Sequence, residues 1–287
     1  MTWFLDLRAQ STGGGLSDSV AVYNQDAPSS PAELEKEIGG RNILVVTHGF
    51  NVNRRDGRNA LSLWESMLSL PGDVAYVGVL WPGDSSWLHG LDYPVEGGEA
   101  INSGNRLGDF LTKNFPASAL LFASHSLGAR VVLQAIRRIG GKMPVRNLML
   151  MAGAIDDTCL EDEYQDAARN VEKISVLSSF HDEVLALAFP LGNFFQGILD
   201  RGSPYMHAAL GREGPRTAAN GRVQSGWQIP DAWHYGHHDY LPSAPCHAPP
   251  LPLPQTVPPV KGPASPWTFP EWQQAWSAAM LCSRFWP

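Results

Sequence analysis

The chain has 287 residues, of which 44% are hydrophobic and 17% charged, a balance typical of a globular protein with its own core. The formal net charge is -7 and the sequence has no block of Lys or Arg, so we expect no nucleic-acid partner. No run of about 18 consecutive apolar residues occurs, and we therefore expect no transmembrane segment.

The first ten residues, MTWFLDLRAQ, lack the basic start and the long apolar stretch of a signal peptide. We therefore expect a cytoplasmic protein, with export left open. Cys159, Cys246 and Cys282 are too few and too scattered for a disulfide scaffold. We expect three free thiols, and the alternative is a bridge between Cys246 and Cys282.

Apolar segments predict six strands, most of them buried on both faces of a sheet. They are residues 2–7, 42–47, 74–81, 119–124, 147–153 and 173–179. Amphipathic helical patterns at 57–70, 96–114 and 127–140 alternate with these strands. This alternation predicts an α/β fold with a mostly parallel central sheet flanked by helices. Because such sheets bind ligands beyond the carboxyl ends of their strands, we expect the chemistry to lie just after these segments.

Residues 1–240 are predicted to form one catalytic domain. Between residues 185 and 230 the periodicity weakens, which indicates a lid over a pocket or a plain surface excursion. Residues 241–270 contain eleven prolines, which exclude a regular helix and favour an extended strap. Apolar residues recur at helical spacing in 271–285. We therefore predict a proline-rich strap and a short helix packed on the domain over 241–287.

Residues 119–132 predict a strand, a sharp turn and a helix, with Ser126 at the turn. A serine in this position has its hydroxyl lifted clear of the backbone, as in the nucleophile motif G-x-S-x-G. Ser124 replaces the first glycine of that motif, and Gly128 supplies the second. Both positions must be small because the strand and helix approach closely. We expect the turn to tolerate Ser124, with its hydroxyl hydrogen-bonded locally.

His48, Gly49 and Phe50 directly follow the strand predicted at 42–47. A glycine here lets the backbone turn so that the Phe50 N–H points toward a substrate oxygen. The N–H of Leu127, directly after Ser126, supplies a second donor. The sequence therefore predicts an oxyanion hole formed by Phe50 and Leu127.

Three segments carry a resemblance to the α/β-hydrolase superfamily: VVTHGFNV (45–52), VLWPGD (79–84) and ASHSLGARVV (123–132). Within it, the chain is similar to bacterial hydrolases of unknown function that have HGFN, WP and HSLG motifs. The resemblance covers about residues 40–240. It implies the α/β-hydrolase fold and serine-hydrolase chemistry without a cofactor, and it leaves the natural substrate open.

A serine nucleophile needs a histidine base, and the histidine needs an acid that orients it. In this superfamily the residues follow in the order serine, acid, histidine. Asp182 comes after the strand predicted at 173–179, and the resemblance favours this later position for the acid. Asp156 and Asp157, which follow the preceding strand, are the alternatives.

The segment DAWHYGHHDYLP (231–242) offers three candidates for the base. The resemblance to a G-H-x-x-Y motif favours His237, with His238 and then His234 as alternatives. Together with Asp239 these residues include ligand types that bind zinc. No H-E-x-x-H pair accompanies them, so we expect no metal site.

These motifs predict a carboxylesterase that cleaves small-molecule esters through an acyl-enzyme intermediate. Ser126, His237 and Asp182 are its expected triad. The alternatives are a lipase, thioesterase or amidase with the same triad, or a non-catalytic binding protein with the same fold. The sequence does not predict the acyl chain length or the oligomeric state.

Overall fold

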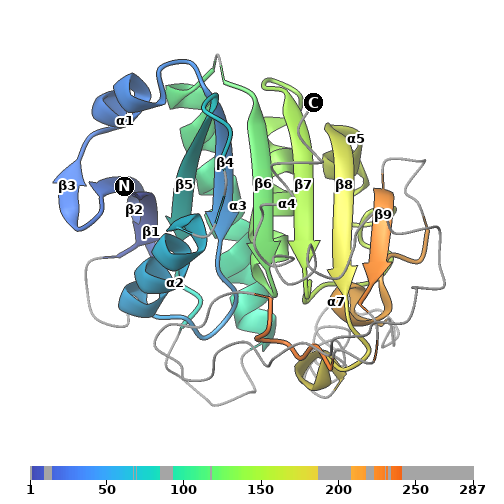
Figure 1. The fold of residues 1–287 in the computed structure, drawn as a ribbon. Coiled ribbons are helices and arrows are strands. Elements are labelled where there is room, and N and C mark those ends of the chain that lie inside the picture. The colour runs from blue at the N-terminus through green and yellow to red at the C-terminus, as the bar shows by residue number, and fades with distance from the viewer. Residues whose placement is uncertain are drawn as a thin grey trace.

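A nine-stranded sheet forms the centre of the computed structural model (Figure 1). The structure describes residues 2–9, 15–66, 68, 70–84, 93–116, 118–186, 208–217, 223–229, 231 and 234–240. The strands are β1 (Trp3–Arg8), β2 (Leu16–Asn24), β3 (Ala27–Ser29), β4 (Asn42–Thr47), β5 (Val74–Leu80), β6 (Leu120–His125), β7 (Val145–Met151), β8 (Val171–Ser178) and β9 (Val223–Gln228).

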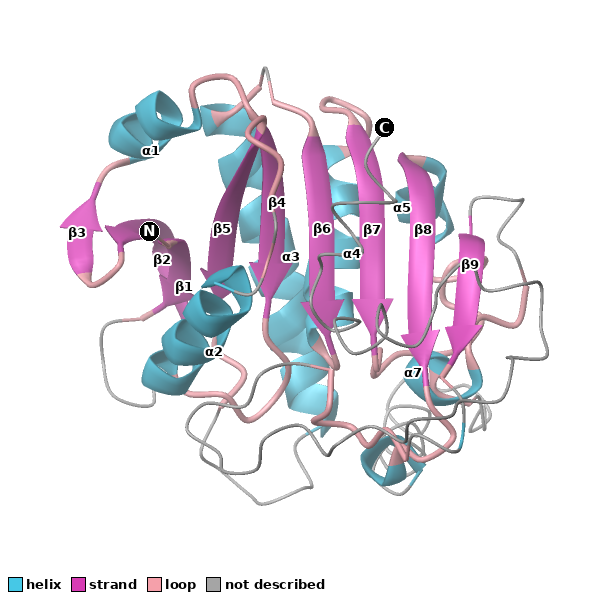
Figure 2. Cartoon of the chain, in the orientation of Figure 1, coloured by secondary structure: helices cyan, strands magenta, loops and turns pink. Residues whose placement is uncertain are grey.

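The strands lie in the order β3-β2-β1-β5-β4-β6-β7-β8-β9. The β1–β2 and β2–β3 pairs are antiparallel, and every other neighbouring pair is parallel. The described helices are α1 (Pro31–Ile38), α2 (Arg54–Ser66), α3 (Tyr93–Asn114), α4 (Gly128–Ile139), α5 (Gln165–Arg169) and α7 (Leu210–Glu213). Figure 2 shows α2 in front of the sheet and α3 and α4 behind it. The predicted fold class is confirmed.

Strand β4 illustrates why the predicted strands are continuously apolar. Ile43 and Val45 point into the core cluster that includes α3 and α4. Leu44 and Val46 point into the opposite cluster, which contains the apolar side chains of α2. Because successive strand residues face opposite sides and both sides are covered, every position from 43 to 46 is buried.

Three strands were absent from the sequence prediction: β2, β3 and β9. The last lies in the stretch 185–230, for which a lid or a plain surface excursion was expected: Val223–Gln228 is a strand of the central sheet paired with β8. Residues 187–207, within the same stretch, lie outside the described residues. The strap and helix expected over 241–287 also lie outside them, as do Cys246 and Cys282. Cys159 is a buried free thiol.

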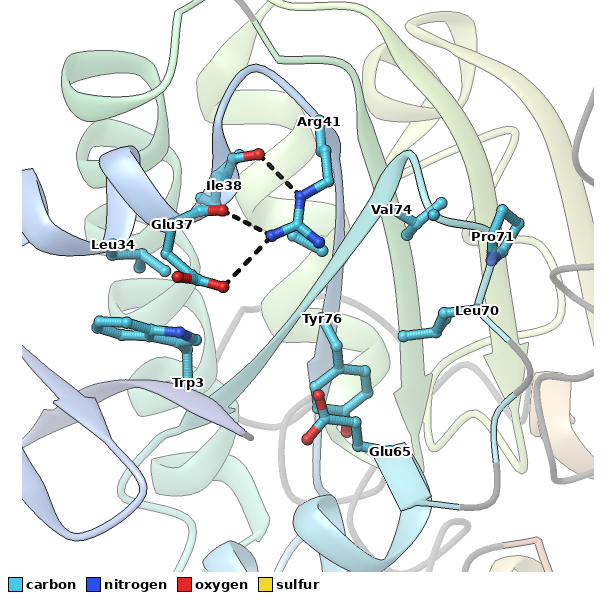
Figure 3. Close-up of a pocket in the computed structure, with 12 residues that line it drawn as sticks. Trp3, Leu34, Glu37, Ile38, Arg41, Glu65, Leu70, Pro71, Val74 and Tyr76 are labelled. Atoms are coloured by element: carbon cyan, nitrogen blue, oxygen red, sulfur yellow. Dashed lines mark hydrogen bonds and ion pairs between the residues drawn. The ribbon is translucent and has the colours of Figure 1, made fainter.

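None of the described helices is long and apolar enough to cross a membrane. A hollow of about 330 Å³ lies at the amino ends of β1, β4 and β5 (Figure 3). Arg41 at its rim donates to the carbonyl oxygens of Ile38 and Glu37, and Tyr76 donates to the carbonyl of Leu61. The hollow therefore lies at the edge of the sheet opposite to the sequence motifs.

Candidate active site

Ser126 lies at the turn between β6 and α4, with a φ of 54°. A non-glycine residue rarely adopts this left-handed conformation, which costs about 1–2 kcal/mol. The turn is fixed by backbone hydrogen bonds on both sides. The Ser126 N–H donates to Met151 O at 3.0 Å, and its carbonyl accepts from the N–H groups of Ala129 and Ala154. The strain is therefore retained by the strand on one side and the helix on the other.

The glycines at 49 and 128 allow the loop after β4 to pack directly on this turn. A Cβ on Gly128 would lie 2.4 Å from the His48 carbonyl oxygen. A Cβ on Gly49 would lie 2.8 Å from the Ser126 Cβ. Neither position has room for a side chain, so the two motifs depend on each other for their placement.

The prediction for Ser124 is wrong in one respect. Ser124 does fit in β6, where it is paired with Thr47 of β4 and Leu150 of β7. However, the Ser124 Oγ is buried and makes no hydrogen bond to any residue that the structure describes. The expected local hydrogen bond is not formed because the neighbouring backbone groups are engaged in the parallel sheet.

The structure brings Ser126, His237 and Asp182 together in one chain of hydrogen bonds. Ser126 Oγ lies 2.8 Å from His237 Nε2, and His237 Nδ1 lies 2.7 Å from Asp182 Oδ2. Because a carboxylate oxygen accepts, His237 Nδ1 carries the proton and donates a hydrogen bond to Asp182. His237 Nε2 is then the acceptor for the serine hydroxyl. All three side chains are buried, with Asp182 fully removed from solvent.

Asp182 is oriented by backbone groups as well as by His237. Its Oδ1 accepts the N–H of Leu185 at 2.9 Å, and its own N–H donates to the Ser179 carbonyl. The alternative acids have other surroundings. Asp157 pairs with Arg216 at 3.2 Å, and Asp156 forms an isolated bridge with Ala209. The carboxylate that contacts His237 is that of Asp182.

The other two histidine candidates lie beside the triad without joining it. The His238 ring is 5.3 Å from that of His237 and nearly perpendicular to it. Partial burial, followed by the neighbouring His237, lowers the pKa of His238. His234 packs against His181, at 4.8 Å between ring centres. Asp239 accepts the Gly236 N–H at 2.7 Å, so its carboxylate stabilises the turn that carries His237.

Both predicted oxyanion donors lie close to Ser126: Leu127 directly follows it, and Phe50 follows Gly49, whose backbone packs on Ser126. Leu127 is buried at the start of α4, and Phe50 lies in the loop after β4. Neither backbone N–H donates to any other residue within the described part of the chain. An N–H that remains available beside a nucleophile is what an oxyanion hole requires. The catalytic role of these two groups stays a prediction.

His48 and Trp81 fix the loop that contains Phe50. Trp81 Nε1 donates to the His48 carbonyl at 2.9 Å, and the Trp81 backbone N–H approaches His48 Nε2 at 3.4 Å. His48 Nδ1 then carries the proton and donates to the Gly49 carbonyl at 2.8 Å. Burial lowers the pKa of His48 to about 4, so the imidazole is neutral near neutral pH.

Sequence reasoning missed Arg8, which ties β1 to this edge of the sheet. Its Nη1 donates to the carbonyls of Val52 and Trp81, each at 3.0 Å, and its guanidinium forms an ion pair with Asp84. Arg8 thereby joins the loops that follow β4 and β5. A signal was present, because Asp6 and Arg8 are charged residues within an otherwise apolar strand.

No group of three or more His, Cys, Asp or Glu side chains among the described residues is arranged to hold a metal ion. What the fold and site define is an α/β hydrolase: a mostly parallel sheet with a strained serine between a strand and a helix. The family model described as "Alpha/beta hydrolase of unknown function (DUF900)" matches residues 28–202. The chain belongs to this family. No curated protein matches it.

Among solved structures, the chain is similar to phospholipase PlaB from Legionella pneumophila, at 16% identity and a TM-score of 0.30, over 50% of this chain and 39% of that one. It is similar to a cutinase-like protein from Cryptococcus sp., at 12% identity and a TM-score of 0.31, over 47% of this chain and 75% of that one. The chain is also similar to a hydrolase of the alpha/beta superfamily from Xanthomonas campestris pv. campestris, at 17% identity and a TM-score of 0.31. This match covers 56% of this chain and 83% of that one. The chain thus spans 39% of the phospholipase's length, and these likenesses carry no conclusion about activity.

Proposed function

We propose that this protein is a serine carboxylesterase that acts on small-molecule esters. The observation that carries the proposal is the chain of hydrogen bonds from Ser126 Oγ through the His237 ring to Asp182. A serine hydroxyl becomes a nucleophile when a positioned imidazole accepts its proton. Asp182 is suited to stabilise the imidazolium that forms, because its carboxylate contacts the opposite ring nitrogen.

The reaction proceeds in two steps. His237 accepts the Ser126 proton as Oγ attacks the ester carbonyl, and the Phe50 and Leu127 N–H groups donate to the developing oxyanion. The tetrahedral intermediate then collapses, and His237 protonates the leaving alcohol. Water, deprotonated by the same imidazole, attacks the acyl-enzyme and releases the acid and free Ser126. The triad supplies every proton transfer, so this scheme needs no cofactor.

Active-site labelling with a fluorophosphonate tests the nucleophile. We expect the wild-type protein to be labelled and Ser126→Ala to lose both labelling and ester hydrolysis, with kcat reduced by about 10⁴-fold or more. Ser124→Ala is the matched control, because this serine lies two residues away and its hydroxyl forms no hydrogen bond with a described residue. It should retain labelling. A folded wild-type protein that is not labelled would instead indicate a non-catalytic binding protein.

The bond and the acyl group are tested with a second measurement. We expect hydrolysis of p-nitrophenyl esters, with kcat/KM varying along a series from acetate to palmitate, and little hydrolysis of the matching p-nitroanilides. A maximum at long chains would redirect the assignment to a lipase, and faster cleavage of thioesters would redirect it to a thioesterase. Preferential cleavage of anilides would contradict the esterase assignment.

A further inference from the structure

His125 is a buried histidine that the proposed mechanism does not use. It is the last residue of β6, directly before Ser126, and is paired with Met151 in the sheet. Its Nε2 lies 2.6 Å from the backbone carbonyl oxygen of His237. Because a carbonyl only accepts, the proton is on Nε2 and His125 donates this hydrogen bond.

The same ring also contacts the loop that carries Phe50. A Cβ on Gly49 would lie 3.0 Å from His125 Nδ1, so the imidazole packs tightly against the Gly49 backbone. The ring is also 4.9 Å from the His237 ring and 6.1 Å from the Tyr240 ring, centre to centre. His125 therefore lies between two loops. One carries Phe50, and we call it the oxyanion loop; the other consists of residues 234–240, and we call it the base loop.

Two strands of the sheet hold the base loop by its backbone. From β6, His125 donates to the His237 carbonyl; just after β8, Ser179 Oγ donates to the Tyr235 carbonyl at 2.6 Å. Within the described residues, His125 is the partner that fixes the carbonyl of the base itself. The end of β6 thus positions both Ser126, which directly follows it, and the backbone of His237.

We propose that His125 is a positioning residue that holds the His237 backbone in register with Ser126 and the oxyanion loop. This inference rests on the proposed function in so far as it concerns turnover. A misplacement of about 1 Å between reacting groups can lower a rate about a hundredfold, so a fixed backbone at residue 237 has a direct kinetic consequence.

The surroundings of His125 suit a neutral donor better than a second base. Burial, followed by the electrostatic effect of the nearby His237 imidazole, lowers the pKa of His125 well below its usual value. The ring therefore stays uncharged near neutral pH, with one nitrogen bonded to the carbonyl and the other packed against Gly49. A neutral side chain that has an N–H donor at the same distance from Cα should therefore retain the role of His125.

The test compares His125→Phe with His125→Gln. Phenylalanine keeps a ring of similar size but has no donor, whereas the glutamine amide nitrogen is as many bonds from Cα as Nε2 is. We expect kcat in His125→Phe to fall about tenfold to a hundredfold with KM within about twofold. His125→Gln should stay within about threefold of wild type. The melting temperature establishes that both variants are folded.

His238→Phe is the control, because its ring is almost as close to His237 but it donates no hydrogen bond to the base loop. It should keep kcat within about threefold. Wild-type kcat in His125→Phe, or an equal loss in His125→Gln and His125→Phe, would overturn the inference.

Amide hydrogen exchange measures the same contact without catalysis. Exchange in residues 236–240 should accelerate about tenfold in His125→Phe and remain close to wild type in His125→Gln. Equal exchange in all three proteins would contradict the positioning role. If no ester is cleaved and no fluorophosphonate reacts, the proposed function fails, while the exchange comparison still decides how His125 holds the base loop.

Discussion

The two edges of the sheet differ in which residues adopt left-handed backbone. At the amino edge, α1 and α4 end in the glycine pairs Gly39–Gly40 and Gly140–Gly141, which take positive φ at little cost, and Gln25, in the turn after β2, is an exception with a side chain. At the carboxyl edge, Asn51, Ser126 and Ala152 adopt positive φ although each has a side chain. Such strain is retained where the surrounding structure requires one particular geometry.

The polar groups differ in the same way. At the amino edge, Arg41 donates to the backbone carbonyls of Ile38 and Glu37 in the wall of the hollow (Figure 3), and Tyr76 donates to the Leu61 carbonyl behind it. At the carboxyl edge, the Phe50 and Leu127 N–H groups donate to no described residue. We infer that the amino edge is arranged for stability, and that the carboxyl edge sacrifices some stability to keep groups available for chemistry.

The largest expected effect is that of Asp182→Asn at the carboxyl edge. An amide cannot hold His237 in the tautomer that leaves Nε2 free to accept the serine proton, so kcat should fall about 10³–10⁴-fold. Steady-state kinetics with a p-nitrophenyl ester measures the loss. Asp157→Asn is the control and should keep kcat within a few-fold, because Asp157 pairs with Arg216. Full activity in Asp182→Asn would transfer the role of the acid to another carboxylate.

The next comparison places one methyl group at each edge. In Gly128→Ala, the new Cβ would meet the His48 carbonyl oxygen, so the oxyanion loop must move. We expect kcat to fall about a hundredfold and the free energy of unfolding to drop by about 1–3 kcal/mol. In Gly140→Ala, the nearest heavy atom is 3.6 Å from the new Cβ, and only the positive φ is strained.

Gly140→Ala should therefore lower the free energy of unfolding by about 1–2 kcal/mol and leave kcat within twofold. Urea denaturation and kinetics on both variants separate the two effects. Equal losses of kcat at the two sites would mean that catalysis follows global stability, and the distinction between the edges would not hold.

The fold could be read from the sequence wherever strands are buried on both faces. The six predicted strands match β1 and β4–β8, with ends displaced by at most two residues. β2 and β9 were missed because an edge region carries a weaker pattern: β2 reads LSDSVAVYN and is mostly half-buried or exposed. The short β3 contains a proline, which gives no strand signal.

The site was only partly accessible from the sequence. Serine, acid and histidine each follow a recognisable local pattern, and the structure brings the predicted three side chains together. The hydrogen bond from His125 joins residues 112 positions apart, and a local pattern carries no information about such a contact. Arg8 is marked in the sequence by its charge within an apolar strand, but the pattern does not show that its partners are Asp84 and two backbone carbonyls in other loops.

Ser124 offers a smaller test of the carboxyl edge. Its buried Oγ has no hydrogen-bond partner among the described residues, and a buried polar group without a partner costs about 1–3 kcal/mol. Ser124→Ala should therefore raise the free energy of unfolding by about 1 kcal/mol and leave kcat within a few-fold. Urea denaturation measures the change. A loss of stability would mean that the hydroxyl has a partner.

The smallest expected effect belongs to the amino edge, where Arg41→Met removes the guanidinium at the rim of the 330 Å³ hollow. The carbonyls of Ile38 and Glu37 that it contacts are near the helix end and can bond to water instead. Because no described residue that lines the hollow contacts the triad, kcat and KM should each stay within twofold. The same ester assay provides the measurement. A tenfold change in either constant would show that the two edges are coupled, and the strain at Ser126 would then need an explanation that includes the packing of α1 against the sheet.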